Sequence, residues 1–235
     1  MIKKLFIVIA VYLGICLIYL YSCYIGLIDM YQRGFIDKVM FCENLMGSDY
    51  HSIKSYGLVI AFAAIVSCYF FLGREQVIRE VRYASVFRYC FRLFIQSICF
   101  FLLLSFLYEG CCVILSLCMG DVELLIKHHW VIAVIFQGLV AALFYTMMYF
   151  LFLIVSLYVK KGFALFLLVI FLPVQLYFGD IIWMPSTELD WMQRFAYDEY
   201  TALEPAVVLL RYVLVMIIIF FVFKRVKERK DNFSV

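Results

Sequence analysis

WVIAVIFQGLVAALFYTMMYFLFLIVSLYV, which runs from Trp130 to Val159, decides the fold class because it contains no charged residue. An α-helix rises about 1.5 Å per residue, and the hydrocarbon core of a bilayer is about 30 Å thick. About 20 apolar residues are therefore enough to cross it. The run exceeds that length, so it predicts a membrane-spanning helix that is tilted or extends past the membrane.

The rest of the chain has the same pattern. Of its residues 67% are hydrophobic and 16% charged, compared with about 45–50% and about 25% in soluble domains. The excess falls in long apolar runs separated by short polar stretches. We predict an all-α membrane protein with a single transmembrane domain over residues 1–235 that crosses the bilayer six times. The predicted spans are Leu5–Ile28, Tyr56–Gly73, Leu93–Met119, Trp130–Val159, Phe163–Gly179 and Ala206–Phe223, the fifth with a bend at Pro173.

The basic residues predict the orientation. Both chain ends and the links after spans two and four carry most of the 20 Lys and Arg residues, whereas Asp and Glu gather in the remaining links. Cytoplasmic loops are enriched in Lys and Arg. We therefore expect both termini in the cytoplasm, which requires an even number of spans. Residues 29–55 and 180–205 then form two long outer segments.

The second outer segment keeps large apolar residues among its acidic ones. Tryptophan and tyrosine favour the membrane–water interface. We expect Ile181–Tyr197 to form short helices that lie on the outer leaflet or dip into it, in a re-entrant manner. Trp183 and Trp191 would lie at headgroup depth. The alternative is a loose outer loop.

GREQVIREVRYAS, residues Gly73 to Ser85, links spans two and three. Its apolar residues recur at helical spacing and form one stripe, while charged residues occupy the opposite face. We predict an amphipathic cytoplasmic helix over residues 74–90. It could anchor on anionic lipid or dock on a soluble partner, and its mixed charge favours a protein surface. The stripe contains Val77, Ile78, Val81 and Ala84, and the other face Glu75, Arg79, Arg82 and Tyr83.

This arrangement resembles the ABC-2-type permease subunits of ABC transporters. The resemblance covers essentially the whole chain and rests on three features: six spans with the N-terminus inside, the Arg/Glu helix after span two, and the re-entrant-like segment after span five. The helix begins with Gly73-Arg74-Glu75. Where the family's helix often carries a Gly-Thr pair, this sequence has Arg79-Glu80-Val81, which leaves the substrate open.

The resemblance implies a cytoplasmic ATP-binding subunit as partner and a second permease subunit, identical or related, that shares the transport path. ATP and Mg²⁺ would belong to the ATPase, and this chain would hold no cofactor. The expected function is export of a hydrophobic or amphipathic substrate, such as a peptide, an antimicrobial or a lipid-linked molecule, across a bacterial plasma membrane. The implied docking residues are Arg74, Glu75, Arg79, Glu80 and Arg82, with a lesser contact from Lys160 and Lys161.

Two other classes remain open. One is a membrane scaffold or peptide immunity protein that does not transport. The other is a channel, although the spans have few polar residues for a wide aqueous pore. No GxxxxGK[ST] or GxSxG motif occurs, so we expect no enzyme activity in this chain, and we expect no nucleic-acid partner. The adjacent His128 and His129 do not share a helix face, and the nine cysteines, mostly in apolar runs, predict free thiols.

Polar residues inside the predicted spans are the remaining candidates for function. Ionisable groups in a membrane are costly and usually face a partner or the bundle interior. Glu109 and Arg211 have opposite charge and similar predicted depth, so we expect a salt bridge between spans three and six. The alternative is that each reaches the interface separately. The full set is Gln96, Glu109, Gln137, Gln175 and Arg211.

Overall fold

The computed structural model describes residues 2–47, 52, 54–80, 85–127, 129–178, 184–196, 200–201 and 203–233. Within these residues the chain is helical and has no strand, which confirms the predicted all-α class. In this described part of the chain, five helices are long and apolar enough to cross a membrane. They are Lys3–Gln32, Ser55–Leu72, Val86–Cys118, Trp130–Ser156 and Glu204–Lys230.

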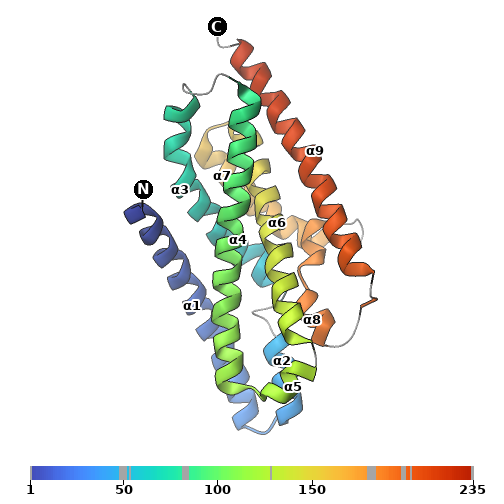
Figure 1. The fold of residues 1–235 in the computed structure, drawn as a ribbon. Coiled ribbons are helices and arrows are strands. Elements are labelled where there is room, and N and C mark those ends of the chain that lie inside the picture. The colour runs from blue at the N-terminus through green and yellow to red at the C-terminus, as the bar shows by residue number, and fades with distance from the viewer. Residues whose placement is uncertain are drawn as a thin grey trace.

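Figure 1 shows the helices arranged as an elongated bundle. The predicted fifth span corresponds to α7, which continues past Pro173 but has a shorter apolar stretch, Lys161–Gln175. The described elements are α1 (Ile2–Gln32), α2 (Lys38–Gly47), the π-helical turn η2 (Ser55–Ile60), α3 (Ala61–Glu80), α4 (Val86–Met119), α5 (Val122–Lys127), α6 (Trp130–Ser156), α7 (Lys161–Phe178), η3 (Pro185–Glu188), α8 (Trp191–Ala196) and α9 (Glu204–Phe233).

The prediction of one separate helix over residues 74–90 is wrong. Helix α3 continues through Gly73 to Glu80, and α4 begins at Val86 after Ser85, whose backbone is extended. A single glycine is tolerated inside a helix, and no proline ends α3 earlier. Ser85 is the N-cap residue of α4, and its side chain makes no capping hydrogen bond. Arg82 lies outside the described residues.

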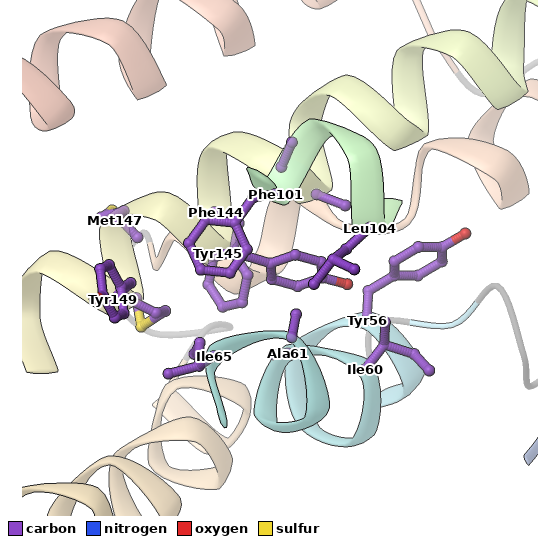
Figure 2. Packing of buried hydrophobic residues seen from close by; sticks show 14 of the residues in the cluster. Tyr56, Ile60, Ala61, Ile65, Phe101, Leu104, Phe144, Tyr145, Met147 and Tyr149 are labelled. Atoms are coloured by element: carbon purple, nitrogen blue, oxygen red, sulfur yellow. The ribbon is translucent and has the colours of Figure 1, made fainter. Parts of the chain in front are cut away.

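Helix α6 forms the centre of the bundle. In its apolar window 72% of the residues are buried, compared with 17% in that of α1. Tyr145 and Tyr149 pack their rings against Phe101 of α4, with centroids 6.1 and 5.8 Å apart. Figure 2 shows Ala61 of α3 meeting this seam. Helix α6 therefore contacts both α4 and α9, which also pack on each other through Phe94 and Phe220.

The two ends of the bundle differ. One end, which we call the basic end, holds the α6–α7 link, the last turns of α3 and the C-terminal turns of α9 (Figure 1). There Lys4 Nζ donates to the Phe71 carbonyl over 3.2 Å, and Lys230 Nζ donates to the Leu157 carbonyl over 2.5 Å. The opposite end, the cap end, is formed by α2, α5, η3 and α8.

The cap end has its own small core, formed where α1 meets α2. Leu27 packs there with Phe41 and Leu45. A salt bridge of 2.6 Å between Lys38 Nζ and Asp121 Oδ2 ties α2 to the start of α5, and this partner raises the pKa of Lys38. The first predicted outer segment is therefore largely structured in its described part.

Candidate functional site

Residues 184–196, which we call the inserted segment, occupy the cap end between α6 and α9. The segment contains η3 and α8, so the prediction of short helices is confirmed for its described part. It lies inside the protein: Leu189, Trp191 and Met192 have no exposed surface. Loops usually run over protein surfaces and are mobile, so a segment buried to this extent has a specific seat.

Gln137 of α6 provides the centre of that seat. Its Nε2 donates to the Leu189 carbonyl over 2.9 Å, and the Trp191 amide donates to its Oε1 over 3.0 Å. One side chain thus pairs with the backbone as a neighbouring strand would. Gln137 follows the first residue of α6 by seven positions, or about 10 Å along the axis. The inserted segment therefore reaches well below the helix end.

Helix α9 holds the other side of the inserted segment. Arg211 Nη1 donates to Glu188 Oε1 over 3.0 Å, and the Tyr212 hydroxyl donates to the Pro185 carbonyl. The predicted pair of Glu109 with Arg211 is therefore wrong. Glu188 is the nearer carboxylate because the inserted segment turns back into the bundle, which the depth estimate along two straight helices could not include.

An aromatic contact completes the seat. The ring of Trp191 meets Phe136 edge-on at 4.8 Å, and Phe195 packs at 6.0 Å. Arg194 lies over the Trp191 ring and bonds to Asp190 over 2.8 Å. Burial raises the pKa of Asp190, and the nearby Arg194 opposes that shift only partly. Trp191 thus packs against protein instead of facing headgroups, and Trp183 lies outside the described residues.

A second polar centre lies in the interior around Glu109 of α4. The Tyr56 hydroxyl donates to Glu109 Oε1 over 2.5 Å, while Oε2 has no hydrogen-bond partner. The hydroxyls of Tyr12 and Tyr145 also lack partners, and both tyrosines interact electrostatically with Glu109. We call these four residues the Glu109 cluster. The cluster is buried, and Glu109 Oε2 and the two hydroxyls have no hydrogen-bond partner there.

The remaining predicted polar residues stand apart from both centres. Gln175 of α7 is fully buried, and its Nε2 donates to Met148 Sδ over 3.3 Å while its Oε1 has no partner. Gln96 is half-buried on α4. The predicted polar set is thus divided between the inserted segment, the Glu109 cluster and single positions.

The predicted docking residues lie at the basic end. Arg74, Glu75, Arg79 and Glu80 belong to the last turns of α3, and their side chains are not among the described ones. Lys160 and Lys161 precede and begin α7, and Lys161 Nζ lies 5.9 Å from the ring of Tyr69 on α3. The two predicted docking regions are therefore neighbours in space.

Metal chemistry has no evident site in the described part of the chain, where no three His, Cys, Asp or Glu side chains are grouped to hold an ion. His128 lies outside that part. All nine cysteines are free. Cys42, in a polar stretch of the sequence, is buried and accepts a hydrogen bond from the Asp121 amide over 3.3 Å. Its role is therefore to join α2 to α5.

No protein-family model, curated protein or solved structure matches the chain. Its function is therefore inferred from the geometry described above.

Proposed function

We propose that the chain is the membrane subunit of an ABC exporter of the ABC-2 permease type, driven by a separate cytoplasmic ATPase and paired with a second permease subunit. The observation that carries the proposal is the contrast between the two ends. The end of α3 and the start of α7, both of which carry basic residues, lie at one end, and an ordered segment is seated inside the other. This contrast suits a protein that receives force on one side and opens on the other.

Six crossings are supported by the directions of the helices. The start of α6 and the start of α9 both contact the inserted segment, through Gln137 and Arg211. Their C-terminal ends meet at the basic end, where Lys230 contacts Leu157. Helices α6 and α9 are therefore parallel, so the chain has to return between them. Helix α7 provides that return as a short sixth span, and both termini lie on one side.

A continuous path of packed elements joins the two ends. Helix α4 begins at Val86, soon after the end of α3 at Glu80 in the sequence, and α4 packs along α6. Gln137 on α6 then holds the inserted segment. If a partner displaced the link after α3, the displacement would act first on α4 and then on α6. Through α6 it would reach the seat of the inserted segment at the cap end. Proteins transmit such displacements through close-packed interiors of low compressibility.

The substrate class in this proposal is hydrophobic or amphipathic. The predicted spans offer a bundle interior rich in Phe and Tyr, which suits an apolar path better than an aqueous one. ATP and Mg²⁺ are bound by the ATPase in this proposal. The setting is a multi-pass position in a bacterial plasma membrane.

Site-specific photocrosslinking tests the proposal. A photoreactive amino acid at Glu75 or Arg79 should capture a protein that contains a P-loop and hydrolyses ATP, whereas the same probe at Asp29 or Lys127 of the cap end should not. Joint charge reversal, Glu75→Lys with Arg79→Glu, should release that protein while the bundle keeps its melting temperature. Capture of no ATPase, or an ATPase that binds equally well after the reversal, would favour the scaffold or immunity class.

A further inference from the structure

A lateral groove lies between α1, α3 and α7. It encloses about 1270 Å³. Its walls are almost entirely apolar and include Val11 and Ile15 of α1, Phe62 and Val66 of α3, and Leu172 and Pro173 of α7. Helix α1 leans away from the bundle toward its N-terminus (Figure 1). Within a bilayer such a groove is open to lipid.

The groove has the depth of one leaflet. Its lining on α1 runs from Lys3 to Ile15, and that on η2 and α3 from Leu58 to Phe70. Twelve residue steps of helix correspond to about 18 Å, and half of the hydrocarbon core is about 15 Å. A hydrogen bond of 2.6 Å between Tyr19 and Ser55 ties α1 to η2 beyond Ile15. A transmembrane helix of a partner would need both leaflets, so the depth favours a lipid.

The open end of the groove is positively charged. Lys3 and Lys4 line it there, and no lining residue is acidic. Lys4 Nζ donates one hydrogen bond to the Phe71 carbonyl, and an ammonium group has three donors, so two remain for a ligand. Lys161, outside the lining, lies over the ring of Tyr69, which precedes the lining residue Phe70 in the sequence. Basic pockets beside transmembrane helices recognise anionic lipid headgroups.

We propose that this groove binds one acidic phospholipid from the leaflet at the basic end, with its phosphate on Lys3 and Lys4 and its acyl chains along the apolar walls. The lipid completes the packing of α1, whose groove-facing side chains Val11 and Ile15 are otherwise exposed. Bound lipid should therefore stabilise the fold, because a ligand that binds only the native state raises its stability. The proposal concerns this chain alone and requires no ATPase.

The test uses the full chain purified in detergent. Dioleoyl phosphatidylglycerol should raise the melting temperature saturably, and native mass spectrometry should show one retained lipid per chain. Dioleoyl phosphatidylcholine, which has the same acyl chains and no net charge, should bind at least about tenfold more weakly, a difference of about 1.4 kcal/mol. Equal effects of the two lipids would overturn the proposal.

Matched variants locate the site. Lys3→Ala with Lys4→Ala should lose the preference for the acidic lipid, and Lys3→Arg with Lys4→Arg should retain it. Lys160→Ala with Arg225→Ala removes two positive charges at the same end outside the groove and should leave the preference unchanged. Val66→Trp should block binding with both lysines intact, which keeps the test decisive if the double alanine variant does not fold. A chain that dimerises through this groove and binds neither lipid would overturn the proposal in favour of a contact between two copies.

Discussion

Gln137 on α6 and Trp191 on α8 are joined as two strands would be, because the Trp191 amide donates to Gln137 Oε1 over 3.0 Å while Gln137 Nε2 donates to the neighbouring Leu189 carbonyl. All three residues are fully buried. Burial of an unpaired polar group costs about 1–3 kcal/mol. The seat of the inserted segment therefore depends strongly on a single side chain.

Gln137→Leu should release the inserted segment. The substitution removes both hydrogen bonds and leaves a carbonyl and an amide unpaired, so we expect a loss of about 1–3 kcal/mol for each group. For a chain of this size that corresponds to about 2–4 °C in melting temperature per kcal/mol. Hydrogen–deuterium exchange over residues 184–196 should become faster. Gln175→Leu makes the same change at another buried glutamine and should leave this exchange unaltered; equal acceleration in both variants would contradict the prediction.

Arg211 should couple to Glu188 and not to Glu109. Its guanidinium contacts the Glu188 carboxylate at 3.0 Å. In a double-mutant cycle, Arg211→Gln and Glu188→Gln should show an interaction of about 0.5–3 kcal/mol, whereas Arg211→Gln and Glu109→Gln should add within about 0.5 kcal/mol. Thermal unfolding in detergent provides the measurement. Coupling of Arg211 to Glu109 in place of Glu188 would mean that α4 and α9 pair directly, against the geometry observed.

Asp190 should make the fold less stable as the pH rises. Burial raises its pKa in the folded chain, more than Arg194 lowers it. Between the unfolded value, about 4, and the raised value, the folded state binds more protons than the unfolded state. Stability is thus highest below the unfolded pKa and falls as the pH increases through this window.

Asp190→Asn should remove that dependence. The melting temperature of the native chain minus that of the variant should decrease from pH 4 toward pH 7. Asp29→Asn is the matched control, since Asp29 forms the same i,i+4 bond with Arg33 at 2.8 Å but is exposed. A difference that increases with pH would show that the attraction to Arg194 outweighs burial.

The sequence was sufficient for those features that depend on local composition. Apolar runs predict the five long helices, since each run exceeds the length a bilayer requires. The boundary near residue 74 was mispredicted because a helical pattern continues through Gly73 without a stop signal. The partner of Arg211 was mispredicted for another reason. The partner of Arg211 depends on how a distant segment of the chain folds. The periodicity of apolar residues in a sequence does not predict such a contact.

For the Glu109 cluster, the sequence led us to expect only Glu109, paired with Arg211, and none of the three tyrosines. Tyr56, Tyr12 and Tyr145 lie in three different apolar runs. Tyrosine is common near membrane interfaces, so a tyrosine in such a run does not by itself indicate a site. Their proximity to one carboxylate follows from the packing of α1, η2 and α6 on α4. Sequence spacing within one helix could not have brought them together.

Reporter fusions should show that α7 crosses the membrane. An enzyme that needs disulfides for activity works only outside the cytoplasm, so its fusion after Val159 should be inactive and its fusion after Leu203 active. A fluorescent protein that folds in the cytoplasm should give the opposite result at the same two positions. Identical readings at both would mean that α7 returns to the side from which it started, and that the chain crosses five times.

The contact between α4 and α6 at the Glu109 cluster should tolerate no added atoms. Gly138 of α6 faces α4, and a Cβ there would lie 3.1 Å from Phe106 Cε1 and 3.3 Å from Glu109 Cγ. Gly138→Ala should therefore require Phe106 or Glu109 to shift by a few tenths of an ångström, at a cost of about 1–3 kcal/mol that outweighs the gain of about 1 kcal/mol in helix propensity. Gly110→Ala is the matched control. It changes a glycine beside Glu109 in the chain, but a Cβ there meets no atom within 4 Å, and alanine favours a helix over glycine by about 1 kcal/mol. We thus expect a lower melting temperature for Gly138→Ala and an equal or higher one for Gly110→Ala.

If Gly138→Ala acts through Glu109, its cost should shrink in a Glu109→Ala background, where Cγ is absent. An unchanged cost in that background would assign the whole effect to Phe106.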